Sequence, residues 1–167
     1  TYSKMVRYEE ALEYFQKAIA IREEVLDAQH PSLASSYNNI GVTYLNMGRY
    51  DQALVYHQKA LAIREEVLDA QHPHLAISYN NIGVTYLNMG RYEQALAFHQ
   101  KALAIKKEVL DAQHPYLANS YNNIGRTLTE LQQYKAAQES LQKAIAIFKA
   151  VSYTHLRAHE TKRNLVC

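Results

Sequence analysis

Apolar side chains recur three and four positions apart along most of this chain, with polar side chains between them. From Tyr50 to about Leu68 the apolar residues fall on one side of a 3.6-residue helix, and no β-branched alternation interrupts them. A stretch from about Leu33 to Met47 is also helical in pattern. Pro31 lies in its first turn, where a missing N–H costs nothing, and Gly48 follows its end as a left-handed stop. The pattern predicts two helices joined by a short turn.

This pair of helices is predicted several times, because the sequence repeats itself. Pro31, Pro73 and Pro115 lie 42 residues apart, and residues 30–71 differ from 72–113 at only seven of 42 positions. Such a period is typical of stacked helical units, each too small to bury its own apolar face. We call the helix after each proline the first-type helix and its successor the second-type helix. The prediction is an all-α fold, an α-solenoid of antiparallel helix hairpins with about seven helices.

The pattern is interrupted at the start of the chain. Residues 1–29 align with the later part of a unit, so a second-type helix is predicted from Tyr8 to Leu26, preceded by the end of a first-type helix. Tyr14, Ala18 and Ile21 would then be exposed, whereas their counterparts face a neighbouring unit. The chain is therefore expected to be a fragment of a longer array. The predicted units are 1–32, 33–74, 75–116 and 117–150, followed by a non-repeat tail at 151–167.

The last unit and the tail depart from the repeat. After Val151 the run Ser-Tyr-Thr-His-Leu-Arg resembles the translated library adapter that ends many environmental reading frames, and the alternative is a native capping extension. Four residues of the last unit replace those of the earlier copies: Arg126, Leu128, Glu130 and Gln132. Gln132 stands where the stop glycine was, which we expect to cost about 1 kcal/mol at that turn.

The motif inside each unit points to a family. Tyr37-x2-Ile40-Gly41-x2-Tyr44, followed by Ala53, resembles the tetratricopeptide repeat, and its 42-residue form with a His-Pro before each unit is similar to the kinesin light chain type. Small residues allow two helices to cross closely. The resemblance implies a right-handed superhelix whose first-type helices line a concave groove. It implies little about function, because such arrays are attached to motors, proteases and kinases alike.

One stripe of the first-type helices is free to meet a ligand. Asn39, Val42 and Asn46 lie opposite the tyrosines at about 100° per residue, and the resemblance turns them toward the groove. Asparagine is unfavourable within a helix, so its recurrence needs compensation, and a primary amide can bond both the N–H and the C=O groups of an extended peptide. The predicted peptide-binding residues are Asn39, Asn46, Asn81, Asn88, Asn123, Val42, Val84 and Arg126, flanked by Asn38, Asn80 and Asn122.

Other interpretations stay open. The amides could instead bond neighbouring helices of the same array. The chain could be an architectural spacer, a self-association segment with open repeat ends, or the regulatory arm of an enzyme whose catalytic domain lies outside this sequence.

Charge and composition favour protein partners. Lys and Arg total 18 against 16 for Asp and Glu, and the excess lies in residues 151–167, so residues 1–150 carry no net charge. Nucleic acids and anionic membranes attract clustered cations, and no apolar stretch reaches the length of a membrane helix. We therefore expect a protein or peptide ligand and neither nucleic acid nor membrane. Cys167 is the sole cysteine, which fits a reducing, cytoplasmic location.

The remaining polar residues give no prediction of catalysis. His30, His72 and His114 precede prolines at helix starts, where a structural role is simplest, and His57 and His99 occupy the core position that Phe15 holds in the first unit. The charge runs at 22–24 and 64–66 are expected to be solvated surface. No phosphate loop or zinc motif occurs. We expect no enzymatic activity, no metal and no cofactor.

Overall fold

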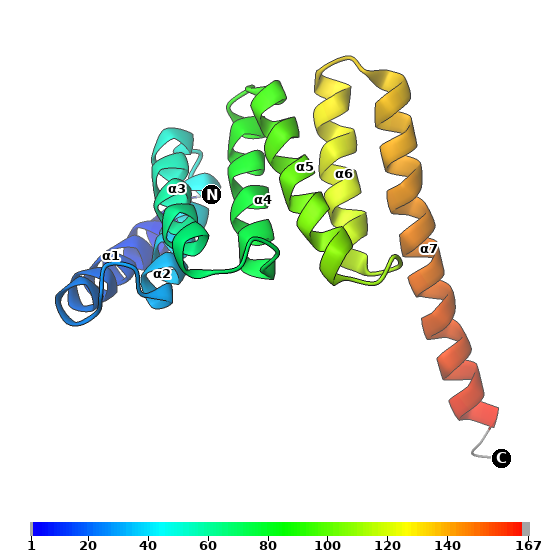
Figure 1. Cartoon of the computed structure of the whole chain (residues 1–167), viewed down its shortest axis with the longest axis horizontal. Coiled ribbons are helices and arrows are strands. Elements are labelled where there is room, and N and C mark those ends of the chain that lie inside the picture. Colours follow the sequence, from blue (N-terminus) through cyan, green and yellow to red (C-terminus); the bar gives the residue numbers. More distant parts are fainter. Residues whose placement is uncertain (1, 165–167) are drawn as a thin grey trace.

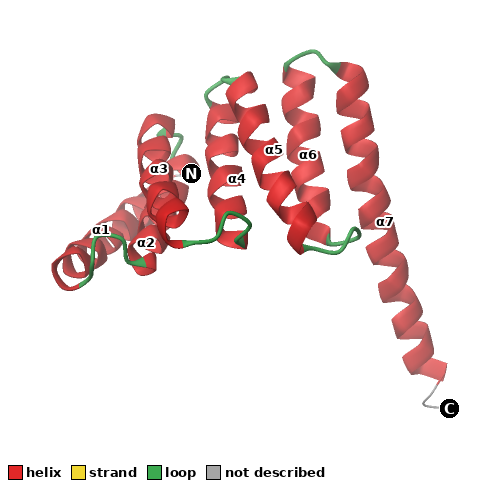
Figure 2. Ribbon diagram, viewed as in Figure 1, coloured by secondary structure: helices red, strands yellow, loops and turns green. Residues whose placement is uncertain are grey.

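The computed structural model describes the backbone of residues 2–164 and the side chains of residues 5–152. These residues form seven helices and no strand, arranged as a curved row of helices that alternate in direction (Figures 1 and 2). The predicted solenoid is therefore confirmed. The helices are α1 (Tyr2–Val25), α2 (Pro31–Asn46), α3 (Tyr50–Val67), α4 (Pro73–Asn88), α5 (Tyr92–Val109), α6 (Pro115–Glu130) and α7 (Tyr134–Asn164).

Local chemistry sets the ends of the first-type helices α2, α4 and α6. The Nδ1 atom of His72 accepts the backbone N–H of His74 at 3.1 Å and so caps α4, whose first residue is the proline that needs no N–H partner. The equivalent caps at His30 and His114 measure 3.2 Å. After the C-terminal end of α2, Gly48 adopts φ 74°, a left-handed conformation that glycine tolerates without steric cost. The histidine-proline pair is thus a helix-starting device.

Helix α1 differs from the prediction. We expected a break near Tyr8 between two helices, but α1 runs without interruption from Tyr2 to Val25. The residue aligned with Gly48 is Val6, and a β-branched side chain strongly disfavours the left-handed conformation that makes the turn. The chain therefore continues as helix where the later units turn.

The last unit keeps its turn despite losing the glycine. Gln132 takes φ 58°, among the described residues the one non-glycine with a positive φ, and so reproduces the left-handed turn of Gly90. Helix α7 then continues to Asn164, whereas α3 and α5 end at Val67 and Val109. The interpretation of 151–167 as an adapter falls mostly on residues whose side chains lie outside the described part of the chain.

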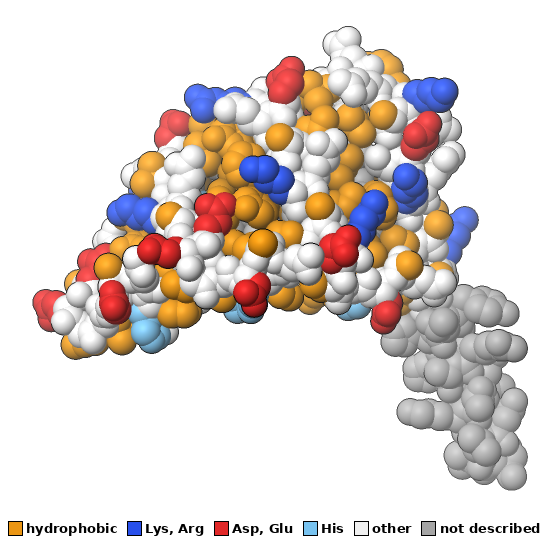
Figure 3. Space-filling model, viewed as in Figure 1, with side chains coloured by type: hydrophobic (Ala, Val, Ile, Leu, Met, Phe, Trp, Pro, Cys, Tyr) orange, Lys and Arg blue, Asp and Glu red, His pale blue; other side chains and the backbone are white. Residues whose placement is uncertain are grey.

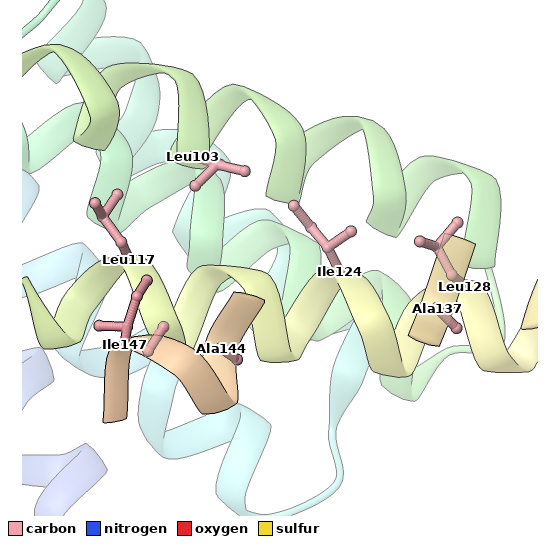
Figure 4. Packing of buried hydrophobic residues seen from close by; sticks show 8 residues of the cluster. Leu103, Leu117, Ile124, Leu128, Ala137, Ala144 and Ile147 are labelled. Carbon is pink, nitrogen blue, oxygen red and sulfur yellow. The ribbon is translucent and has the colours of Figure 1, made fainter. Parts of the chain in front are cut away.

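The helices pack in a regular order that separates an inner from an outer side. Each first-type helix packs on the second-type helix of its own hairpin and on the one before it, and successive first-type helices also touch each other. Among the described residues, the backbones of the second-type helices stay farther from one another than those of successive first-type helices. Buried side chains fill the space between the packed helices. Figure 4 shows one such hydrophobic core, where side chains of α5, α6 and α7 meet, including Leu103, Ile124 and Ile147. The closely spaced first-type helices therefore form the inner wall.

The outer side of α1 is exposed, as predicted for Tyr14 and Ile21, whose exposed fractions are 72% and 62%. Ala18 is only half-buried. The counterpart of Tyr14 is Tyr56, which packs on a cluster that includes Leu12 and Ile19 of the neighbouring unit, as expected. The counterpart of Ile21 is Ile63, which instead lies in a cluster with Leu33 of its own hairpin. The exposed Ile21 therefore corresponds to a position that a first-type helix covers in the later units.

Candidate functional site

The inner wall of α2, α4 and α6 carries the stripe predicted from the sequence. Asn39 and Asn46 are exposed, and Val42 and Val84 are half-buried. The opposite side of each first-type helix holds buried Ile40 and its equivalents. The stripe is thus available on the wall, with apolar contact area between its amides.

The asparagine side chains of successive helices bond one another. Asn81 donates its amide N–H to the side-chain oxygen of Asn38 at 2.9 Å, and Asn123 donates in the same way to Asn80 at 3.0 Å. Each pair joins two first-type helices across the seam between adjacent units. We call these two pairs, Asn38 with Asn81 and Asn80 with Asn123, the amide ladder. They match the alternative in which the amides bond neighbouring helices of the same array. Each side chain uses one donor or one acceptor in the ladder.

The remaining predicted residues are arranged differently. Asn39 and Asn122 stand at the two ends of the ladder and are exposed, and their side-chain amides make no hydrogen bond with a described residue. Asn88 is occupied locally, since it donates to the backbone oxygen of Val84 at 2.8 Å. Asn46 is exposed at the end of α2. The ladder therefore has an unoccupied amide at each end.

Arg126 is brought beside Asn88 by the packing of α6 on α4. A hollow of about 240 Å³ is lined by both side chains together with Glu130, Leu87 and Tyr92. It combines a cation, a carboxylate and an amide on the first-type helices. Such a hollow suits a polar side chain of a ligand.

A second set of contacts between units was not predicted. Arg64 is only 6% exposed, and its guanidinium donates to Ser78 Oγ at 2.7 Å and to the backbone oxygen of His74 at 3.3 Å. The expectation that the 64–66 run is solvated surface is therefore wrong for Arg64. The position recurs, with Arg22 bonded to Ser36 and Lys106 bonded to Ser120 at 2.8 Å. Burial lowers the pKa of Lys106 and of Arg64. The fourteen-residue separation of the partners was the overlooked signal.

The histidines inside the array lack polar partners. His57 and His99 are each 1% exposed, as expected for a core position, and neither ring nitrogen makes a hydrogen bond. Burial lowers the pKa of both rings from 6.5 to about 4; nearby Arg64 contributes at His57, and Lys106 and Arg126 contribute at His99. Both rings are therefore neutral at neutral pH.

Neither metal binding nor membrane spanning finds support in the described residues. No group of three His, Cys, Asp or Glu side chains gathers there, and the rings of His72 and His74 lie 4.9 Å apart with one committed to the helix cap. Within the same residues, no helix has the length and apolar character needed to cross a bilayer.

Comparison with known families agrees with this geometry. The family described as Tetratricopeptide repeat matches residues 1–66, 34–108 and 74–150. The chain belongs to the tetratricopeptide repeat family. Arrays of this family are scaffolds for protein–protein interaction, and the fold supports that general role here. No curated protein matches the sequence.

Several solved structures resemble the chain closely in shape. BtubC (BKLC) from P. vanneervenii has a TM-score of 0.81 at 23% identity, over 87% of this chain and 58% of that one. A Podosopora anserina protein of nearly identical TPR-like repeats, assigned as a kinesin light chain, has a TM-score of 0.71 at 25% identity, over 86% and 68%. The apo form of RapI has a TM-score of 0.75 at 23% identity, over 96% and 46%. The repeats are thus kinesin light chain-like, and the chain spans little more than half of BtubC.

Proposed function

We propose that this tetratricopeptide array binds an extended peptide segment of another protein along the inner wall of α2, α4 and α6. The observation that supports the proposal is the row of primary amides crossing all three helices, with hydrogen-bonding capacity left over. A cytoplasmic location belongs to the same proposal, because the repeats need no disulfide.

The unused capacity can be counted atom by atom. Asn81 and Asn123 each spend one N–H in the ladder and keep a second N–H and the side-chain oxygen. Asn39, at the end of the row, spends none with described residues. A peptide backbone presents one N–H and one C=O per residue, so alternating donors and acceptors along the wall match it without reading its side chains.

The surroundings of the row suit an extended ligand. Val42 and Val84 are half-buried beside the amides and offer apolar contact. The hollow at Arg126 and Asn88 can receive a polar side chain. Helices about 10 Å apart each span about three extended residues, so the bound segment would have roughly six to ten residues.

The test uses variants that separate binding from folding. Asn39→Ala removes an amide with no partner in the array, and Asn39, Asn81 and Asn123 can be changed together. We expect peptide capture from a display library to weaken in the single variant and to be lost in the triple variant, with helicity retained. Gln94→Ala, which removes an exposed amide on α5, is the matched control. Undiminished capture by a folded triple variant would refute the proposal.

An architectural function is the second candidate, and two observations favour it. The ladder bonds Asn38 to Asn81 and Asn80 to Asn123, which serves the array itself. Helix α1 also exposes Tyr14 and Ile21, a face suited to self-association. If association dominates, light scattering will show mass rising with concentration, and Tyr14→Ser with Ile21→Ser will abolish the rise. A constant monomer mass would exclude self-association.

A further inference from the structure

The outer side of the array has its own series of grooves. The backbones of neighbouring second-type helices stay apart on this side, and a tyrosine of the first-type helix lies between each pair, under a lysine: Tyr37, Tyr79 and Tyr121. The groove between α1 and α3 has a volume of about 250 Å³, with Tyr37 at its floor and Glu23 and Lys59 at its rims. One face of the molecule carries hydrophobic patches between Lys, Arg, Asp and Glu side chains (Figure 3).

In the first two grooves the tyrosine is held by charges of both signs. Tyr79 donates its hydroxyl to the Glu65 carboxylate at 2.7 Å, and the Lys101 ammonium lies 5.5 Å from the centre of its ring. Tyr37 donates to Glu23 in the same way. Burial and this hydrogen bond raise the pKa of Tyr79 to about 12. Each groove thus contains its own carboxylate.

The third groove, between α5 and α7, lacks that carboxylate. Lys107 stands at the position of Glu65, so two ammonium groups flank Tyr121, with Lys107 and Lys143 at 5.8 and 5.7 Å from its ring centre. The Tyr121 hydroxyl donates to no described residue, and neither lysine forms an ion pair with one. The groove therefore has cations and a hydroxyl donor without an acceptor.

A hollow beside α5 adjoins the third groove at Lys107. This hollow, of about 480 Å³, lies over the C-terminal half of α5 and is lined by Gln71, Gln100, Leu103, Ala104, Ile105, Lys107 and Glu108. Four of these residues are equivalent to those that α1 contributes to the first groove. Ser140 replaces the aromatic ring of Tyr56 and Phe98, which removes the side chain on which Lys59 and Lys101 also rest.

We propose that the α5–α7 groove binds an acidic peptide segment of a partner protein. A carboxylate of that segment occupies the place that the Glu65 carboxylate has in the preceding groove, accepts the Tyr121 hydroxyl and pairs with Lys107 and Lys143. The apolar and amide lining of Leu103 and Gln100 accommodates the peptide chain. A nucleic acid fits less well, because residues 1–150 carry no net charge and Glu108 lies at the edge of the hollow. This site is on the opposite side from the inner wall and does not depend on it.

The neighbouring groove supplies the decisive variants. Lys107→Glu copies the natural composition of the α3–α5 groove, so the fold is preserved, and Glu65→Lys copies the α5–α7 groove. The probe is a fluorescein-labelled decapeptide alternating Glu and Ser, with Gln in place of Glu as the neutral control. We expect Lys107→Glu to weaken binding of the acidic probe at least tenfold, and Glu65→Lys to raise the stoichiometry from one to two.

Three results would overturn the proposal. The first is equal binding by Lys107→Glu, and the second is equal weakening by Lys135→Glu, a charge-matched change at the far end of α7. The third is oligothymidylate of equal charge binding more tightly than the peptide and being lost in Lys107→Glu. We also expect the triple alanine variant of Asn39, Asn81 and Asn123 to bind the acidic peptide as the wild type does. Failure of the inner-wall proposal can therefore be told apart from failure of the α5–α7 groove proposal.

Discussion

The imidazole ring of His57 lies directly against Gly41 of the preceding helix. A Cβ atom at position 41 would come within 2.6 Å of the His57 ring, and the same relation holds at 2.7 Å between Gly83 and His99. In the last unit the partner of Gly125 is Leu141, which a Cβ would meet at 2.7 Å. The glycine of the repeat motif is therefore required by the large side chain that fills the hairpin, whatever the chemistry of that side chain.

Replacing Gly41 by alanine should destabilise the array. Alanine favours a helix by about 1 kcal/mol over glycine, but overpacking a buried ring costs about 1–3 kcal/mol, so we expect a net loss of about 1 kcal/mol. Urea denaturation followed by circular dichroism measures it. In the His57→Ala background the clash is relieved, and Gly41→Ala should become neutral or stabilising. A loss of the same size in both backgrounds would contradict the packing explanation.

The buried histidines should make the stability pH-dependent. Both have pKa values near 4 in the folded chain and about 6.5 when unfolded, so the unfolded chain binds more protons between these values. Stability is full above pH 6.5 and falls by up to about 3 kcal/mol per histidine as the pH approaches 4. The cations that face them, Arg64 at His57 and Lys106 and Arg126 at His99, act in the same direction as burial on the histidine pKa values.

The control for this pH dependence comes from the chain itself. Leu141 shows that leucine fits the histidine position against a glycine. His57→Leu combined with His99→Leu should therefore flatten the decline between pH 6.5 and 4 in urea melts. A double variant that declines as steeply as the wild type would assign the effect to other groups.

Gln132→Gly should stabilise the last hairpin. Gln132 holds φ 58°, and a side chain in this region costs about 1–2 kcal/mol, partly offset by the greater freedom of glycine in the unfolded chain. We expect a net gain of about 0.5–1 kcal/mol, read as a higher urea midpoint. Gly90→Gln is the reciprocal change and should lose a similar amount. An unchanged midpoint in both would show that the turn carries no conformational cost.

The amide ladder should appear as coupling between helices. A double-mutant cycle with Asn38→Ala and Asn81→Ala cancels the helix preference of alanine and isolates the hydrogen bond, for which we expect about 0.5–1.5 kcal/mol. The pair Asn39 and Asn122 makes no such bond and should show none. Coupling of equal size in both cycles would mean that the measured energy does not come from the ladder.

Structural features that depend on residues of a single unit, such as the helix ends, were predictable from the sequence. The prolines, the stop glycines and the tyrosine motif gave helix limits within about two residues, because caps and turns are local. Contacts between units were not predictable in the same way. Arg64 reads as one more charge on a helix surface, and only the packing of α3 on α4 shows that it is buried against Ser78.

The sequence does not contain the bonding of the asparagines. The periodicity placed the asparagines on one stripe, yet the bond from Asn81 to Asn38 depends on the offset between two helices, which no single helix pattern contains. The continuity of α1 did have a local signal, because Val6 stands where the later units have the glycine of the turn. The alignment of residues 1–29 with the later units predicted a turn there in spite of it. The same kind of local signal, Lys107 in place of Glu65, marks the groove between α5 and α7.

The left-handed Gln132 also gives the array an order of disassembly. The three hairpins α2–α3, α4–α5 and α6–α7 share one arrangement, but only the last is closed by a non-glycine residue in the left-handed conformation. On warming or under mechanical load, we expect the α6–α7 hairpin to open before the other two. One side chain thereby biases the point at which unfolding of the array begins.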